Sequence, residues 1–131
     1  MTMALKVVMI AYVAVDILFG IGFIFLPSQL SEMFGFAKPD GPHLYDLAFL
    51  GVTWIVFSVF IIIAAVRDPL KHIMWVQCEL GWVVLSLVVD VSSIGRGLVT
   101  VSQGAPGLII DAVFTVALLA LYPWRAKPGI A

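Results

Sequence analysis

Apolar residues along the chain gather into four long runs separated by short polar stretches. The runs cover about residues 5–26, 44–66, 72–94 and 106–122. A helix needs about 20 mostly apolar residues to cross a bilayer. The runs are too long for barrel strands and lack the alternation that such strands show. The pattern therefore predicts an all-α, polytopic membrane protein, in which residues 1–131 form one domain, an antiparallel bundle of four transmembrane helices.

Prolines and charged residues mark the ends of these runs. The first run ends at Pro27, the second at residues 67–69 and the fourth at residues 123–125. Pro69 and Pro106 precede or open the third and fourth runs. Proline fits the first helical turn because the N–H that it lacks has no partner there. We therefore interpret both prolines as helix-start residues.

The first run and the connection after it allow two more predictions. The run is about 20 residues long, whereas the apolar core of a signal peptide has about 7–15 residues, so we interpret it as a retained span. The connection, residues 27–43, is the longest in the chain. Its apolar residues Leu30, Met33 and Phe34 predict a short amphipathic turn at the membrane interface.

Composition strengthens the membrane interpretation. Of 131 residues, 63% are hydrophobic and 11% are charged. A soluble domain has about 45–50% apolar and about 25% charged residues. The net charge of −1 provides no basic surface, so nucleic acid is not expected as a partner. The single cysteine, Cys78, excludes an internal disulfide, and its apolar surroundings favour an inert thiol.

Positive charges predict the orientation in the membrane. The N-terminus, the 67–71 connection and the C-terminal tail hold five of the seven positive residues, and the other two connections hold two. Loops rich in lysine and arginine stay in the cytoplasm. We therefore expect a multi-pass protein of the cell inner membrane with both termini cytoplasmic. The five residues are Lys6, Arg67, Lys71, Arg125 and Lys127, and the other two are Lys38 and Arg96.

Every predicted span carries at least one carboxylate. A charged residue at the bilayer centre costs about 2.5–3.5 kcal/mol and normally faces the interior of a bundle. An interhelical hydrogen bond returns about 0.6 kcal/mol on average in membranes, which is too little to explain such residues by structure alone. Burial also favours the neutral, protonated form. The acids are Asp16, Asp46, Glu79, Asp90 and Asp111.

Helical spacing predicts that these acids face inward together. In each span they align with other residues at intervals of three or four, which place them on one helical face. Four such faces would meet along a polar axis, and small residues would allow close approach of the helices. The aligned sets are Tyr12, Asp16 and Gly20; Asp46, Leu50, Thr53 and Phe57; Glu79, Val83, Ser86 and Asp90; and Asp111, Thr115, Leu118 and Tyr122. The small residues are Gly20, Gly51, Ser58, Gly81 and Ser86.

Other roles are open for some of these polar residues. Asp46 lies near a predicted helix N-terminus, where a carboxylate is stabilised by the helix dipole. Asp90 lies near a C-terminus, and Arg96 is its candidate partner in a structural ion pair. His43 and His72 lie at opposite ends of the membrane and cannot share a metal, and the Glu-x-x-His motif of di-metal bundles is missing. We expect neither a metal nor a cofactor.

Two short motifs point to a family. The first span ends in a G-x-G-F-x-F-x-P stretch at residues 20–27, and an R-D-P hairpin follows the second at residues 67–69. With the four spans, the chain resembles small bacterial membrane proteins of the BphX-like and DoxX-like kind. The resemblance implies a bacterial inner-membrane protein and no particular reaction. Small multidrug exporters also carry an acid in the first of four spans, as Asp16 does, but lack the other acids.

The first functional hypothesis is a carboxylate-lined pocket for a lipophilic small molecule such as a terpenoid, quinone or aromatic. A protonated acid in an apolar pocket can protonate an alkene, epoxide or carbonyl, as a cyclase or isomerase requires. Aromatic walls can stabilise the positive charge that develops. The candidate catalytic acids are Asp16, Glu79 and Asp111. The candidate pocket residues are Tyr12, Phe19, Asp46, Thr53, Trp54, Trp82, Ser86, Asp90, Phe114 and Thr115.

Two further hypotheses use the same acids differently. Intramembrane acids serve as proton relays, and a four-span chain would form a proton-coupled transport path as a homodimer. Alternatively, the chain is an accessory subunit of a larger membrane complex, and its acids meet donor groups on a partner helix.

Overall fold

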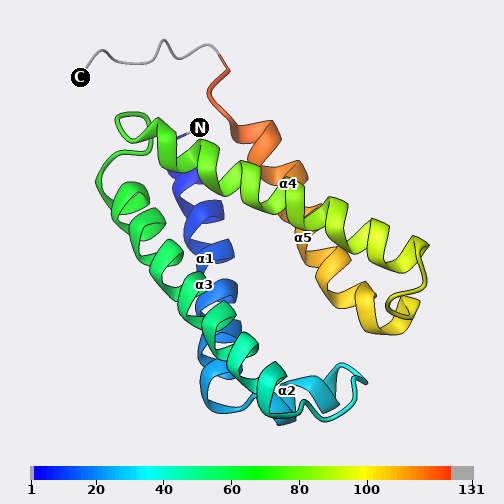
Figure 1. Cartoon of the computed structure of the whole chain (residues 1–131). Coiled ribbons are helices and arrows are strands. Elements are labelled where there is room, and N and C mark those ends of the chain that lie inside the picture. Colours follow the sequence, from blue (N-terminus) through cyan, green and yellow to red (C-terminus); the bar gives the residue numbers. More distant parts are fainter. Residues whose placement is uncertain (1, 125–131) are drawn as a thin grey trace.

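The computed structural model describes residues 2–124, which form five helices and no strand. The four long helices match the four predicted spans, and the short α2 confirms the predicted amphipathic turn (Figure 1). The chain is therefore an all-α, multi-pass membrane protein. Arg125 and Lys127, two of the charges counted for orientation, lie outside the described residues. The helices are α1 (Thr2–Phe25), α2 (Pro27–Met33), α3 (Gly41–Arg67), α4 (Ile73–Gly95) and α5 (Val101–Leu121).

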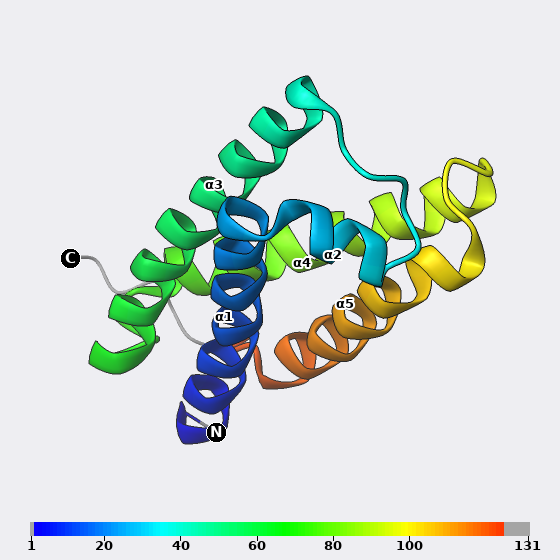
Figure 2. The same cartoon turned by 90° about the horizontal axis from the view of Figure 1, so that it is seen from below.

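The four long helices form two antiparallel pairs. α1 packs mainly on α3, and α4 packs mainly on α5. The contacts of α1 with α5 and of α3 with α4 join the two pairs. α3 and α4 meet near their short connection and diverge toward their other ends, as the view from below also shows (Figures 1 and 2). The bundle is therefore closed at one end and open at the end that holds α2 and the α4–α5 connection.

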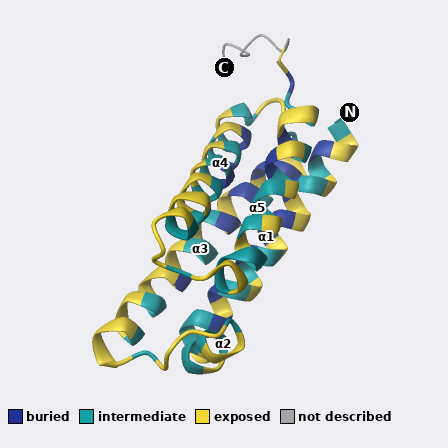
Figure 3. Ribbon diagram, turned by 90° about the vertical axis from the view of Figure 1, so that its right-hand side faces the viewer, coloured by how far each residue is buried: buried dark blue, intermediate teal, exposed yellow. Residues whose placement is uncertain are grey.

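The hydrophobic core occupies the closed half of the bundle. Figure 3 shows the buried residues gathered toward the end where the N-terminus lies. At this end the Lys6 ammonium donates to the carbonyl oxygen of Arg67 at 3.3 Å, which caps the last turn of α3. Nine buried residues form the core cluster: Leu5, Met9, Tyr12, Val13, Ile61, Ala65, Val76, Val83 and Leu118.

Small residues set the rotation of α3 against α1. Gly51, Ser58 and Ala65 are buried at intervals of seven residues, which is one face of the helix. At Gly51 the two backbones approach so closely that an added Cβ would lie 2.5 Å from the carbonyl oxygen of Gly20. The predicted close approach at Gly20, Gly51 and Ser58 is confirmed.

This rotation contradicts the inward face that we predicted for the second span. Asp46 and Thr53 are exposed, and the Thr53 hydroxyl donates back to the Phe49 carbonyl of its own helix at 2.9 Å. Each residue turns a helix by about 100°, so these two lie about 140° and about 160° away from Gly51. Gly81 is also exposed, with open space where a Cβ would stand, so its predicted packing role is wrong.

The two prolines do not start helices as predicted. Pro69 is buried in the turn that Asp68 organises by accepting the backbone N–H of Leu70 at 3.0 Å, and α4 begins only at Ile73. Pro106 lies inside α5. That helix begins five residues earlier because Thr100 and Gln103 form a capping box.

Candidate functional site

A cavity of about 560 Å³ lies between the two helix pairs where they diverge. We call it the central cavity. Its walls come from α1, α3, α4, α5 and the segment after α2. They are formed by Tyr12, Val15, Asp16, Phe19, Phe23, Phe34, Phe36, Trp54, Trp82, Leu85, Ser86, Val89, Asp90, Ser93, Val99, Gln103, Gly104, Pro106, Gly107, Ile110 and Asp111.

Three carboxyl groups face this cavity from three helices. Asp16 comes from α1 and is 5% exposed. Asp90 comes from α4 and Asp111 from α5, and both line the cavity. Tyr12 donates its hydroxyl proton to Asp111 at 3.3 Å and so joins α1 to α5 across the cavity floor. The charges of Asp16 and Asp111 are near enough to interact, so the polar groups form one cluster.

Aromatic rings form much of the remaining wall. Trp54 of α3 and Trp82 of α4 meet edge to face with ring centroids 6.5 Å apart. Phe19 packs against Trp54 on one side and against Phe34 on the other, at 6.3 Å and 5.7 Å. The faces of such rings attract cations, and the rings as a whole pack well against hydrocarbon. The cavity therefore combines an apolar, aromatic wall with a cluster of carboxyl groups.

Glu79 lies behind the cavity wall and does not line the cavity. Its side chain is 0% exposed, and neither carboxyl oxygen has a hydrogen-bond partner among the described residues. Glu79 and Asp16 are both buried, and only Asp16 lines the cavity.

A buried carboxyl group without a hydrogen-bond partner, such as that of Glu79, destabilises the folded protein. Leaving a buried polar group without a partner costs about 1–3 kcal/mol. We therefore expect Glu79→Met, which fills the same space with apolar atoms, to increase the free energy of unfolding by about 1 kcal/mol. The measurement is thermal unfolding of the purified protein in detergent.

Gln77→Met is the matched control on the same helix. The Gln77 amide donates to the Tyr122 hydroxyl at 2.8 Å, so this substitution removes a bond and is expected to bring no gain in stability. A Glu79→Met protein less stable than wild type would mean that Glu79 has a partner that stabilises the fold.

The structure brings together most of the candidate residues. Asp16 and Asp111 line the cavity, as do the pocket candidates Tyr12, Phe19, Trp54, Trp82, Ser86 and Asp90. Phe114 packs on the Tyr12 ring at 4.8 Å and Thr115 is buried, and both lie outside the lining. Asp46 and Thr53 face away, as described for α3.

The proposed Asp90–Arg96 ion pair is absent from residues 2–124, and Arg96 is exposed at the end of α4. Six residues turn a helix by about 600°, which places the two side chains about 120° apart. Asp90 instead rests against α5, where a Cβ on Gly107 would lie 3.1 Å from its Oδ2 atom.

Sequence reasoning missed the part of the wall contributed by the connections. Phe34, Phe36 and Gln103 all line the cavity. The capping-box spacing Thr100-x-x-Gln103 was visible in the sequence and would have extended the fourth helix to include this wall. The position of the two phenylalanines depends on how the connection after α2 folds over the open end, which no local pattern shows.

No protein-family model, curated protein or solved structure matches this chain. Within residues 2–124, no three His, Cys, Asp or Glu side chains are grouped so that they could hold a metal ion. The cavity lining provides carboxyl groups, a phenol and aromatic rings.

Proposed function

We propose that the central cavity binds a lipophilic small molecule with one polar group and acts on it by acid catalysis. The molecule is of the terpenoid, quinone or aromatic class, and the reaction is a cyclisation or isomerisation. The observation that carries the proposal is the presence of three carboxyl groups, from three helices, in the wall of one largely apolar cavity that also holds aromatic rings. A volume of about 560 Å³ lies within the range of about 300–1,000 Å³ that small-molecule sites have.

Asp16 is the candidate general acid. It lines the cavity, and no described side chain forms a hydrogen bond with it, so its proton is free for a bound molecule. In its neutral form Asp16 donates this proton to an alkene carbon or to a carbonyl or epoxide oxygen. The resulting carboxylate then takes a proton from a neighbouring carbon of the cation. The substrate is isomerised, Asp16 regains its proton, and no co-reactant is needed.

The other polar and aromatic groups have supporting roles in this proposal. Trp54 and Trp82 stabilise positive charge on the substrate through their ring faces, an effect worth about 2 kcal/mol in the absence of water. Asp111, held by Tyr12, and Asp90 bind the polar group of the ligand. Glu79 does not line the cavity, so it does not contact the substrate. Any influence of Glu79 on the reaction passes through Asp16.

Filling the cavity tests the binding step. We expect the wild-type protein, purified in its native lipids, to retain a lipophilic molecule that mass spectrometry detects after solvent extraction. Ser86→Trp places a large ring in the cavity and is expected to reduce the retained amount at least tenfold. Ser92→Trp introduces the same ring at an exposed position of the same helix and should retain the molecule. Equal retention by both variants would contradict binding in the central cavity.

One observation favours a second function, proton-coupled transport. Glu79 is buried without a hydrogen-bond partner among the described residues, and Asp16 lines the cavity, so the chain holds one acid in its core and one at the cavity, as a proton path would need. This function requires a second copy of the chain to complete the path. Flux measurements in vesicles, with and without a pH gradient, distinguish it from catalysis.

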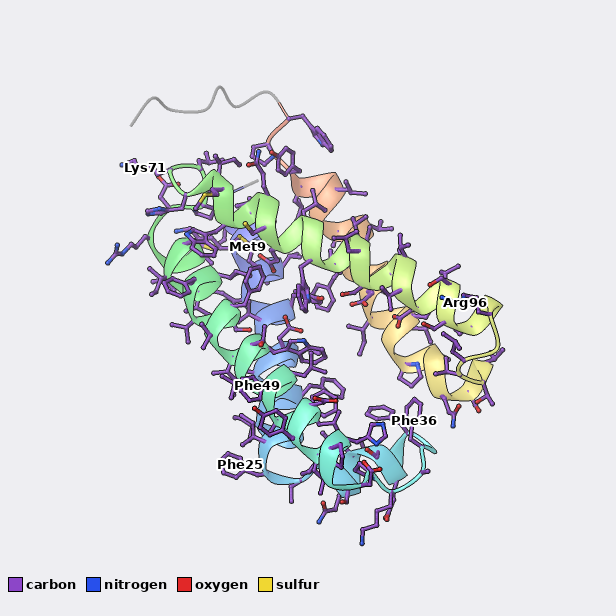
Figure 4. The ribbon with its side chains drawn as sticks, in the orientation of Figure 1. Met9, Phe25, Phe36, Phe49, Lys71 and Arg96 are labelled. Atoms are coloured by element: carbon purple, nitrogen blue, oxygen red, sulfur yellow. The ribbon has the colours of Figure 1, made fainter. Side chains whose placement is uncertain are left out.

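We further propose that the protein resides in a bacterial inner membrane with its N-terminus in the cytoplasm. Lys6, Arg67 and Lys71 gather at the closed end, whereas Lys38 and Arg96 belong to the connections at the open end (Figure 4). The excess of positive charge at the closed end supports this orientation.

A further inference from the structure

A second cavity, of about 580 Å³, lies beside α2 at the open end of the bundle. We call it the outer cavity. Apolar side chains form most of its wall, and polar ones form its rim. It is lined by Phe23, Leu30, Ser31, Phe34, Phe36, Ala37, Lys38, Pro39, Asp40, His43 and Leu47.

Three phenylalanines separate the outer cavity from the central one. Phe23, Phe34 and Phe36 line both cavities, so each ring has one cavity on either side. Figure 4 shows Phe36 between the segment after α2 and the first turns of α5. Phe36 is 41% exposed, and no ring stacks on it among the described residues. The partition between the cavities is therefore made of side chains, and Phe36 is the most exposed of the three.

The rim of the outer cavity has the polarity of a membrane interface. Lys38 and His43 are exposed, and the His43 imidazole lies 2.6 Å from the Asp40 carboxylate. The backbone and the ring of His43 hydrogen-bond to Asp40 and keep the pKa of this carboxyl group below its ordinary value. The rim thus presents charged groups to water, and the cavity floor presents phenylalanine and leucine. An amphipathic molecule fits this arrangement with its polar group at the rim.

A hydrogen bond from the Gln103 side chain connects the segment after α2 to the α4–α5 pair. The Gln103 amide of α5 donates to the Gly35 carbonyl at 2.6 Å, while its own oxygen accepts the Thr100 backbone N–H. Gly35 has a φ of 75°, which an L residue adopts only with strain. The Gln103–Gly35 bond lies next to Phe34 and Phe36 in the chain and holds the partition in place.

We propose that the outer cavity is the access site of the central cavity. A lipophilic molecule with one polar group, such as a terpenoid alcohol, enters it from the membrane with the polar group at the Lys38–His43 rim. It then passes the three phenylalanines when the Gln103–Gly35 bond opens. This inference rests on the proposed binding function and adds to it the route and the gate.

A reversible disulfide across the gate tests this route. A Cβ at Gly35 would lie 3.8 Å from Gln103 Cγ, so cysteines at both positions are within reach of a disulfide. We would introduce Gly35→Cys and Gln103→Cys together with Cys78→Ser, which removes the only native cysteine. Trp75→Phe and Trp124→Phe would leave Trp54 and Trp82 as the only tryptophans, and both line the central cavity.

The probe is a brominated terpenoid alcohol added to the protein in lipid nanodiscs, because bromine quenches tryptophan on contact. We expect the oxidised protein to be quenched at least tenfold more slowly than the same protein after reduction. The single-cysteine variants should not respond to oxidant. In a separate chain with Gln103 intact, Phe36→Ala should accelerate quenching several-fold, because it opens the partition.

The outcomes separate the route from the binding function. Equal quenching rates before and after reduction would refute the gate and leave binding intact. Absence of quenching in both forms, and in the chain with Gly35 and Gln103 intact, would refute binding and the gate together. If strain at Gly35 keeps the two cysteines from bridging, the Phe36→Ala variant decides, and an unchanged quenching rate in that variant would refute the gate.

Discussion

Asp16→Asn is expected to slow conversion of the bound lipophile by about 10²–10⁴-fold, which is the usual contribution of a general acid. Asparagine keeps the shape of the side chain and removes the proton that Asp16 would donate. Asp16 lines the cavity, is more deeply buried than Asp90, and receives no hydrogen bond from a described side chain, whereas Asp111 is held by Tyr12. Affinity for the same molecule should change only a few-fold. The measurement is single-turnover conversion of the molecule identified by extraction.

Asp46→Asn provides the matched control for this substitution. Asp46 is another intramembrane acid of the chain, but it lies exposed on the outer face of α3. Its replacement is expected to leave conversion unchanged. Full-rate conversion by Asp16→Asn would exclude acid catalysis by this residue, and loss of binding without loss of turnover would make Asp16 a binding group only.

Gly51→Leu should decrease the free energy of unfolding by about 3 kcal/mol, at the upper end of the usual penalty for overpacking. A Cβ at this position would lie 2.5 Å from the Gly20 carbonyl oxygen and 2.9 Å from Ile24 Cγ1. The first of these atoms belongs to a helix backbone and cannot rotate away. α1 and α3 would have to separate, and the closed core depends on this pair. Thermal unfolding in detergent measures the loss.

Gly81→Leu introduces the same side chain where it meets nothing within 4 Å. Leucine favours a helix more than glycine does, so this variant should be as stable as wild type or slightly more so. Equal losses in the two variants would show that the membrane environment, rather than the α1–α3 contact, determines the effect.

The sequence predicts the four spans well because hydrophobic length alone determines what can cross a bilayer. It also predicts the inner faces of the first, third and fourth spans, since Asp16, Ser86, Asp90 and Asp111 meet at one cavity. The reason is that an intramembrane acid has few low-energy positions other than a bundle interior.

The second span shows where this reasoning fails. Two faces of α3 were possible, one with Asp46 and Thr53 and one with Gly51, Ser58 and Ala65. Close backbone packing against α1 selected the second face. Asp46 remains exposed three residues after His43, near the helix start, where the helix dipole and interfacial water stabilise a carboxylate. Polarity alone therefore does not identify the inner face near the end of a span.

The sequence predicted a carboxylate-lined pocket, but the divergence of the helix pairs that forms it was beyond sequence reasoning. Equivalent inner faces predict a bundle that closes along its whole length, whereas the two helix pairs diverge toward α2 (Figure 1). We attribute the divergence to side-chain volume. The large rings of Trp54, Trp82 and Phe19 lie between the α1–α3 pair and the α4–α5 pair, where smaller side chains would allow the two pairs to pack together. Such volumes can be judged only when the helices have been placed in space.

The partners of the α4 polar groups have a consequence for how the chain is made. Gln77 of α4 donates to the Tyr122 hydroxyl at the end of α5, and Asp90 of α4 rests against Gly107 of α5, so two polar groups of α4 are covered by the last helix. During synthesis α4 emerges from the ribosome before α5 exists. Alone in lipid, α4 would expose these groups without partners, at a cost of several kcal/mol. The third span is therefore expected to integrate into the membrane only after the fourth has been synthesised. The two spans then enter the bilayer together as one helical hairpin.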